Sequence, residues 1–191
     1  MKSRSLKKTI SILVILVMVF SGPFSSFGAS GFSDTSGHWA ASSIDKAVSY
    51  GFVKGYLDNT FKPDNPVTRA EFSTMLNGAL GITNTTSISF SDVPSNEWYY
   101  ASVRRAVAAG YTGGYEDNTF RPNGKITRQE AAVMISKILP PAQGTTSLSG
   151  LGDNGSIADW ARTAVMKVFA AGYIKGDNNN LYRPTASLSR A

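Results

Sequence analysis

Apolar residues recur at helical spacing in three separate parts of the chain. In the first part, the apolar positions and the glycine that closes them are Ile44, Ala47, Val48 and Gly51. The same spacing returns within 103–110 and within 165–172. It places one apolar stripe on one face of a helix, and the closing glycine suits a left-handed cap at the helix end. The pattern therefore predicts three short amphipathic helices.

A second apolar stripe follows in two of these parts. Its positions are Phe72, Met75, Leu76 and Ala79, and then Ala131, Met134, Ile135 and Ile138. Gly81 and the pair Pro140-Pro141 are stop signals for these helices. The sequences TRAE (68–71) and TRQE (127–130) precede the stripes and fit the capping box, in which the threonine and the glutamate satisfy backbone N–H groups at a helix start. We therefore assign structural capping roles to Thr68, Glu71, Thr127 and Glu130.

Shorter motifs show that the chain repeats three times. Phe32-Ser-Asp34 returns as Phe90-Ser-Asp92 and, more loosely, as Leu151-Gly-Asp153. GYLDNTFKP (55–63) returns as GYEDNTFRP (114–122) and GDNNNLYRP (176–184). The offset is 59 residues from copy one to copy two and 62 from copy two to copy three. In each turn we expect the aromatic residue to fill the core; these residues are Phe61, Phe120 and Tyr182.

These patterns predict a mainly α fold of three tandem helix-turn-helix repeats, at 30–82, 83–140 and 141–191. One helix pair cannot bury its own stripe well, but three pairs can bury theirs against each other. We expect a compact body with approximate three-fold symmetry, and an open solenoid is the alternative. The third copy has Ser189 as its capping residue and stops at Ala191 before a glutamate, so we expect this repeat to be incomplete.

The first 29 residues read as a secretory signal peptide. Basic residues come first, an apolar run at 10–20 follows, and small residues lead to Gly28-Ala29. The run is shorter than the roughly 20 residues that a membrane span needs, so we expect no membrane association after cleavage; an uncleaved anchor is the alternative. Four of the 19 basic residues lie in this leader, and the remaining 15 nearly balance 13 acidic residues. This near balance argues against nucleic acid as a partner.

An arginine follows the capping residue in every copy. These arginines are Arg69, Arg128 and Arg190. At the first position of a helix, the dipole favours negative charge by about 0.3–1 kcal/mol. A guanidinium beside free backbone N–H groups suits a carboxylate. We therefore predict a repeated site for an anionic ligand group; the alternative is a structural ion pair with an aspartate of a neighbouring repeat, such as Asp34, Asp92 or Asp153.

Two further sets of repeated residues are candidate ligand contacts. The first set is Trp39, Trp98 and Trp160, and the second is Lys62, Arg121 and Arg183. A tryptophan face can stack on a sugar ring, although a repeated tryptophan is more often part of a core. The second set adds a cation to each repeat, and a solvated surface charge is the alternative.

No catalytic constellation stands out. His38 is the single histidine, there is no cysteine, and the best carboxylates, Glu71 and Glu130, are engaged in capping. The stretch DNNN (177–180) lacks the later glutamate of a calcium loop and favours a turn. We expect no enzyme activity, no cofactor and no metal in this segment.

The combined motifs, from F-x-D through D-N-T-F-x-P to T-R-x-E, resemble the S-layer homology (SLH) domain. The resemblance covers Phe32 to the last residue as three copies, with the loosest match in copy three. It implies a three-pronged helical body, secreted to the cell surface, that attaches to the peptidoglycan-linked secondary cell-wall polysaccharide of bacteria, typically Gram-positive ones.

The family's usual ligand is a pyruvate-ketal-bearing N-acetylmannosamine, held between neighbouring repeats by the arginine of the T-R-A-E motif. That role falls here on Arg69, Arg128 and Arg190. We expect a non-catalytic wall anchor, with an S-layer lattice region or an enzyme cargo downstream. A wall hydrolase and a helical protein-interaction module are the alternatives.

Overall fold

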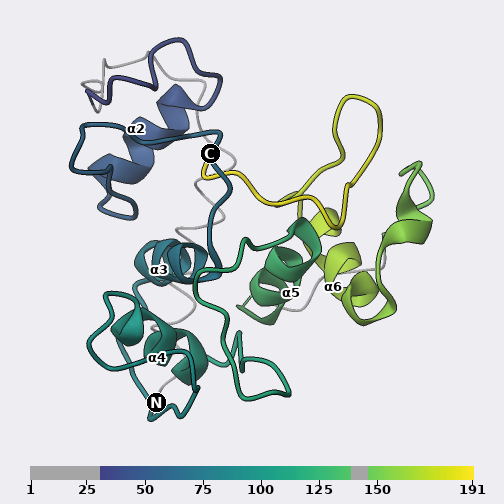
Figure 1. The fold of residues 1–191 in the computed structure, drawn as a ribbon. Coiled ribbons are helices and arrows are strands. Elements are labelled where there is room, and N and C mark those ends of the chain that lie inside the picture. The colour runs from purple at the N-terminus through teal and green to yellow at the C-terminus, as the bar shows by residue number, and fades with distance from the viewer. Residues whose placement is uncertain (1–30, 139–145) are drawn as a thin grey trace, which may run out of the picture. The chain divides into compact units, whose positions relative to one another are not determined.

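The computed structural model describes residues 31–138 and 146–191, and they form mainly helices. The helices are α2 (Ala41–Ser49), α3 (Arg69–Leu80), α4 (Tyr100–Ala108), α5 (Arg128–Ile138) and α6 (Asp159–Ala170), with a short 3₁₀ helix η1 (Asn154–Ser156) (Figure 1). Within these ranges the only β pairing consists of isolated bridges. The prediction of a mainly α fold is confirmed. The predicted leader and Pro140-Pro141 lie outside the described residues.

The chain divides into two compact units, one ending at Phe61 and the other running from Lys62 to Ala191. The first unit contains α2, whose Ile44 is buried. Gly51 follows this helix at φ 72°, as the predicted left-handed cap requires. The Phe61 ring is 1% exposed and lies 5.6 Å from the Phe32 ring, centroid to centroid. The turn aromatic of this copy therefore fills the core, as predicted.

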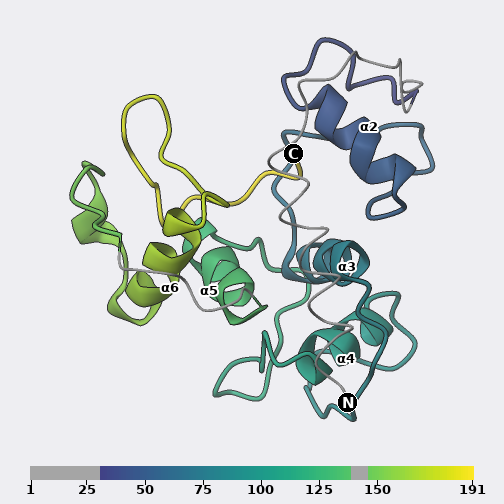
Figure 2. The same ribbon diagram turned by 180° about the vertical axis from the view of Figure 1, so that it is seen from behind.

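In the second unit, the last helix of one repeat packs against the first helix of the next. Helix α3 lies beside α4, and α5 lies beside α6 (Figures 1 and 2). Ala70 of α3 packs with Val103 of α4 and with Phe120, and Ala132 of α5 joins the core of the third repeat. Burial therefore crosses the repeat boundaries within this unit.

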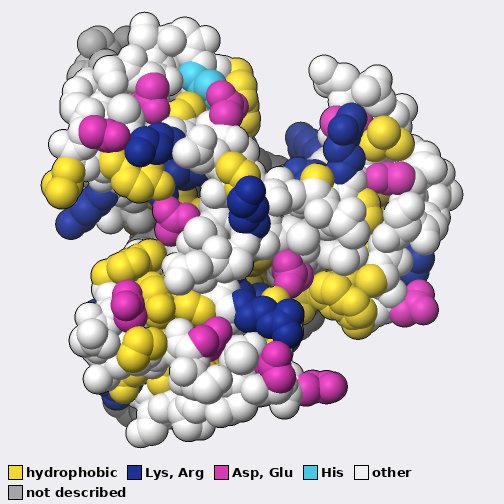
Figure 3. Space-filling view, in the orientation of Figure 1, with side chains coloured by type: hydrophobic (Ala, Val, Ile, Leu, Met, Phe, Trp, Pro, Cys, Tyr) yellow, Lys and Arg dark blue, Asp and Glu magenta, His cyan; other side chains and the backbone are white. Residues whose placement is uncertain are grey.

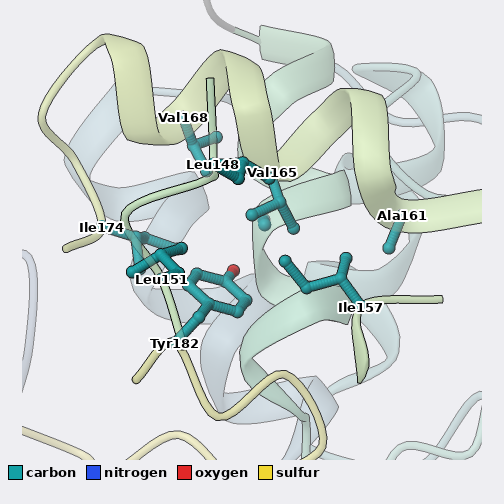
Figure 4. Close-up of a cluster of buried hydrophobic side chains, with 9 residues drawn as sticks. Leu148, Leu151, Ile157, Ala161, Val165, Val168, Ile174 and Tyr182 are labelled. Atoms are coloured by element: carbon teal, nitrogen blue, oxygen red, sulfur yellow. The ribbon is translucent and has the colours of Figure 1, made fainter. Parts of the chain in front are cut away.

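The core of the third repeat shows how a turn aromatic is used. Tyr182 is fully buried, and Figure 4 shows its ring among Leu151, Ile157 and Val165. Phe120 is likewise 0% exposed in the second repeat. The prediction that the turn aromatics fill the core is confirmed in all three copies.

Helix α3 is buried on a side that its apolar stripe does not predict. Its most buried residues include Ala70, Ser73 and Asn77, whereas the stripe residues are only partly buried. The polar side is tolerated because its groups are paired: Tyr111 donates to Asn77 Oδ1 at 2.8 Å, and Asn77 Nδ2 donates to the Ser102 carbonyl at 2.9 Å. Hydrogen bonds thus permit a second buried face that hydrophobic spacing does not reveal.

A closed ring of three backbone hydrogen bonds joins the residues just before the capping positions. The N–H of Val67 donates to Leu188, that of Leu188 to Ile126, and that of Ile126 to Val67, at 2.9, 2.9 and 3.1 Å. Isolated bridges flank the ring at Pro66–Ser189, Thr68–Lys125 and Thr127–Ser187. The three residues occupy equivalent positions in the three repeats, and each donates to its equivalent in another repeat. The three-fold symmetry of the whole body remains a prediction.

Candidate ligand-binding site

Both complete copies of the T-R-x-E motif form the predicted capping box. The Thr68 hydroxyl oxygen accepts from the Glu71 N–H at 3.2 Å, and Glu71 Oε2 accepts from the Thr68 N–H at 2.8 Å. The same two bonds join Thr127 and Glu130 at 3.4 and 2.9 Å. The capping roles of the threonines and glutamates are therefore confirmed, and each arginine occupies the first helical position. In copy three, the Ser189 hydroxyl donates to the Ala191 carbonyl.

The backbone N–H groups at these helix starts are not free, contrary to the prediction. The N–H groups of Arg69 and Ala70 donate to Gly124 and Pro122, at 2.8 and 3.0 Å. Those of Arg128 and Gln129 donate to Ala186 and Pro184, both at 3.0 Å. The turn of the next repeat thus occupies them. Anion recognition at these positions falls to the side chains.

Arg69 is a largely buried guanidinium with few partners. Its residue is 9% exposed, and its Nη2 donates to Thr112 Oγ1 at 2.7 Å. The guanidinium carbon lies 5.0 Å from the ring centroids of both Tyr115 and Phe120. Its Nε is buried without a hydrogen-bond partner among the described residues, and no described carboxylate forms an ion pair with it. The charge of Arg69 acts on the nearby Glu130 carboxylate, but no hydrogen bond joins the two, so the guanidinium keeps unused donors for an anion.

Arg128 has the equivalent place in the second repeat but different partners. Its Nε donates to the Tyr182 carbonyl at 2.7 Å and its Nη2 to the Lys175 carbonyl at 2.8 Å. Its guanidinium lies 5.2 Å from the Tyr182 ring centroid. Burial raises the pKa of Tyr182 to about 12, although the charge of Arg128 opposes that shift. Backbone carbonyls therefore satisfy two of the three nitrogens of Arg128.

Arg190 differs from the other two because it forms an ion pair within the chain. Its Nη1 lies 3.4 Å from Glu71 Oε1, and the two side chains are 9% and 20% exposed. The partner is a capping glutamate of the first repeat, which sequence reasoning did not anticipate.

The predicted aspartate partners serve the turns instead. Asp92 accepts from the N–H groups of Phe120 and Arg121, at 2.8 and 2.7 Å. Asp153 accepts from those of Tyr182 and Arg183, at 2.7 and 2.6 Å. The alternative that Asp92 or Asp153 pairs with Arg69 or Arg128 is therefore wrong. Asp34 likewise accepts from the Phe61 N–H at 2.8 Å.

The cations before the repeated prolines have an uncommon backbone conformation. Lys62, Arg121 and Arg183 have φ of 57°, 57° and 54°, in the left-handed region. This conformation costs a non-glycine residue about 1–2 kcal/mol. Arg121 pairs with Asp117 at 2.9 Å, and Arg183 pairs with Asp177 at 2.6 Å, both near the surface. Both arginines are thus exposed surface charges that each pair with an aspartate of the same turn.

Tyr115 connects several of these groups. Its hydroxyl donates to Glu130 Oε1 at 2.8 Å, and Arg121 lies 4.0 Å from its ring centroid. Burial disfavours the ionised form of Glu130, but hydrogen bonds from Thr127 and Tyr115 and the charge of Arg69 outweigh it, so its pKa is held below the usual value. Sequence reasoning did not select Tyr115 or Thr112. The repeated Gly-Tyr of copies one and two is the signal that points to Tyr115.

The repeated tryptophans lie at the surface. Trp39, Trp98 and Trp160 are 78%, 60% and 61% exposed. The interpretation that they belong to the core is therefore wrong, and their faces can stack on a ligand. Figure 3 shows acidic and basic side chains interspersed over the face that it draws.

The structure adds three observations on metal binding, the predicted turn and membrane spans. Among residues 31–138 and 146–191, no cluster of three or more histidine or carboxylate side chains could hold a metal ion. Asp177 Oδ1 accepts from the N–H groups of Asn179 and Leu181, which is a turn contact. None of the helices in the described ranges is long and apolar enough to cross a membrane.

These features describe a helical repeat module in which each copy carries cationic and exposed aromatic side chains at equivalent positions. The S-layer homology domain matches residues 31–73, 89–132 and 153–191, and the chain belongs to that family. The predicted family is thereby confirmed, together with a location at the cell surface. The family defines these segments as a non-catalytic cell-wall anchoring module.

Three relatives illustrate where such modules occur. The chain is 36% identical to an amylopullulanase of Thermoanaerobacterium thermosulfurigenes, over 84% of this chain and 9% of that protein. It is 35% identical to a cellulosome-anchoring protein of Acetivibrio thermocellus, over 73% and 33%. It is 32% identical to a surface-layer 125 kDa protein of Lysinibacillus sphaericus, over 83% and 14%. The chain thus matches a third or less of the length of each relative.

Proposed function

We propose that this module anchors its protein by binding a peptidoglycan-linked secondary cell-wall polysaccharide through an acidic sugar, such as a pyruvate-ketal-bearing amino sugar. The main support for this proposal is the environment of the Arg69 side chain. Its guanidinium is largely buried, has an unpartnered Nε and has no ion pair with a described carboxylate. A ketal carboxylate would supply a negative charge in direct hydrogen-bond contact with the guanidinium, whose planar form matches the two carboxylate oxygens.

The other predicted residues contribute to binding to different degrees. Arg128 binds a second anionic group, and Arg190 contributes less to ligand binding because Glu71 already neutralises its charge. Trp39, Trp98 and Trp160 stack on neighbouring sugar rings, which their exposure permits. Lys62, Arg121 and Arg183 supply further positive charge, shared with Asp117 and Asp177 in the last two cases.

A repeated site suits a polymer. Each anionic sugar contributes modestly, because a charge-assisted hydrogen bond contributes about 1.5–3 kcal/mol. Two sites on one chain that engage one polysaccharide bind it more tightly than either site does alone. The cargo held in this way is an S-layer lattice region or an enzyme, as the names of the relatives illustrate.

Sedimentation with cell-wall sacculi tests the proposal. We expect the purified chain to sediment with sacculi, to remain in solution after the polysaccharide has been stripped from them, and to release no sugar. Sugar release would support the hydrolase alternative. Sedimentation that persists on stripped sacculi would support a protein-interaction module and would contradict the proposal.

A further inference from the structure

The two arginines of the complete T-R-x-E motifs, Arg69 and Arg128, lie in different surroundings, and the difference comes from a few substitutions between the repeats. We call Arg69 with Thr112, Tyr115 and Phe120 the Arg69 site, and Arg128 with Lys175 and Tyr182 the Arg128 site. Both sites lie within the unit 62–191. The inference below rests on the proposed function, because it concerns which site binds the acidic sugar.

The residue that positions the guanidinium differs between the sites. In the Arg69 site, the hydroxyl of Thr112 accepts the Nη2 bond at 2.7 Å, and Thr112 is 5% exposed. The equivalent residue one repeat later is Ile174, which has no hydroxyl and packs in the apolar core of that repeat. Arg128 instead donates to two main-chain carbonyls. A hydroxyl therefore holds one guanidinium, and the backbone holds the other.

The number of free donors differs as a result. Arg69 uses one of its three nitrogens, and its Nε and Nη1 have no partner among the described residues. Arg128 uses both Nε and Nη2. Recognition of a carboxylate by two parallel bonds needs a pair of neighbouring N–H groups. Arg69 retains more of these donors, and it is also the more deeply buried charge.

The residue after the repeated glycine also differs between the Arg69 site and the Arg128 site. In the Arg69 site, this residue is Tyr115, whose ring faces both Arg69 and Arg121 and whose hydroxyl is fixed by Glu130. The equivalent residue in copy three is Asp177. That substitution removes the aromatic surface, while the Asp177 carboxylate itself pairs with Arg183 at 2.6 Å. The loss of the aromatic ring weakens the Arg128 site relative to the Arg69 site.

We propose that the Arg69 site is the principal site for the acidic sugar, that Thr112 is the positioning residue that holds its arginine ready, and that the Arg128 site binds more weakly. In this arrangement the hydroxyl of Thr112 fixes the guanidinium plane and takes one of the two N–H groups of Nη2, so one pair of neighbouring N–H groups remains for the carboxylate. Since the arginine is ordered before the ligand arrives, less conformational entropy is lost on binding.

Calorimetric titration of the chain with purified pyruvylated wall polysaccharide tests this ranking. We expect Arg69→Ala to lower the affinity about 30-fold or more and Arg128→Ala to lower it less than about threefold. Thr112→Val, which keeps the shape of the side chain and removes the hydroxyl, is expected to lower the affinity about tenfold. Thr112→Ser restores the hydroxyl and is expected to restore affinity to within about twofold. Melting temperatures are measured for all variants.

The outcomes separate the two proposals. Equal losses from Arg69→Ala and Arg128→Ala, or equal affinities of the valine and serine variants, would overturn the ranking and leave the proposed function standing. If the unchanged chain does not bind, or binds depyruvylated polysaccharide equally well, the proposed function fails and the ranking fails with it. If Arg69→Ala has a lowered melting temperature, it is replaced by Arg69→Lys. This variant keeps the positive charge but loses the planar pair of N–H donors, so it is expected to bind more weakly than the unchanged chain.

Discussion

Arg190 Nη1 lies 3.4 Å from Glu71 Oε1, and 119 positions of sequence separate these two residues. The backbone supports this contact, because the Arg190 N–H donates to the Asn65 carbonyl and the Ala191 N–H to the Pro63 carbonyl, both at 3.0 Å. Residues 190–191 of the third repeat are thereby fastened to the segment that precedes α3. The glutamate that caps this helix also neutralises an arginine of another repeat.

Removal of Arg190 should therefore destabilise the chain more than removal of an exposed arginine. We expect Arg190→Ala to lower the free energy of unfolding by about 1–3 kcal/mol, because it leaves a partly buried carboxylate without its cation. Arg162→Ala is the matched control, since its 3.9 Å pair with Asp159 is exposed and contributes about 0–1 kcal/mol. Urea unfolding measures both. Equal effects would show that the Arg190–Glu71 pair adds no stability.

Two glycines with the same backbone angle provide a test of the turn geometry. Gly110 and Gly114 both have φ of 77°, but only Gly114 has close neighbours. A Cβ there would lie 2.4 Å from the Phe90 ring and 2.8 Å from the Thr119 carbonyl oxygen. We expect Gly110→Ala to cost about 1–2 kcal/mol for the left-handed conformation alone. Gly114→Ala should cost clearly more, and equal thermal shifts for the two variants would contradict this packing.

The F-x-D aspartates should be structural. Asp92 accepts the N–H groups of Phe120 and Arg121, and these two bonds hold Arg121 in the left-handed conformation. We expect Asp92→Ala to lower the free energy of unfolding by about 2–4 kcal/mol, since it leaves two backbone donors without their charged acceptor. Asp159→Ala, on an exposed helix start, is the control and should stay within about 1 kcal/mol.

Glu130 should make the chain less stable in acid. Its pKa is held below the usual 4.5, so its stabilising contribution is complete above pH 4.5 and is lost as the pH falls through its own lower pKa. Thermal melts of the unchanged chain should therefore shift downward over that acidic range. Glu130→Gln should reduce this decrease in melting temperature. Part of the decrease should remain, because Asp117, with a pKa of about 2, and Asp177, with a lowered pKa, also lose their charge in acid. A Glu130→Gln melt with an unaltered pH dependence would contradict this role of Glu130.

The elements that the sequence predicts are those set by local chemistry. The threonine and glutamate of each capping box are three positions apart, so one motif contains both partners of both hydrogen bonds. The glycine caps and the turn aromatics follow from short patterns in the same way. Because these motifs recur along the chain, each local prediction applies to every copy of its motif.

The surroundings of the arginines depend on residues far apart in sequence. Thr112 is 43 positions from Arg69, and its role depends on a hydroxyl at a place where the other copies carry Val53 and Ile174. The first N–H groups of α3 and α5 donate to carbonyls in the turn of the next repeat. The sequence of a helix start does not show these distant acceptors, so its N–H groups are wrongly predicted to be free. Exposure of the tryptophans was missed because residue type alone favours burial.

The most direct test of the central claim is the binding of the double variant Arg69→Ala/Arg128→Ala to pyruvylated wall polysaccharide, measured beside its thermal melt. Arg104→Ala is the control, because this exposed arginine donates to the Thr86 carbonyl, away from the motif. We predict that the double variant loses nearly all binding while it still unfolds in one cooperative transition above the assay temperature, and that the control binds normally. Undiminished binding by a folded double variant would contradict the account.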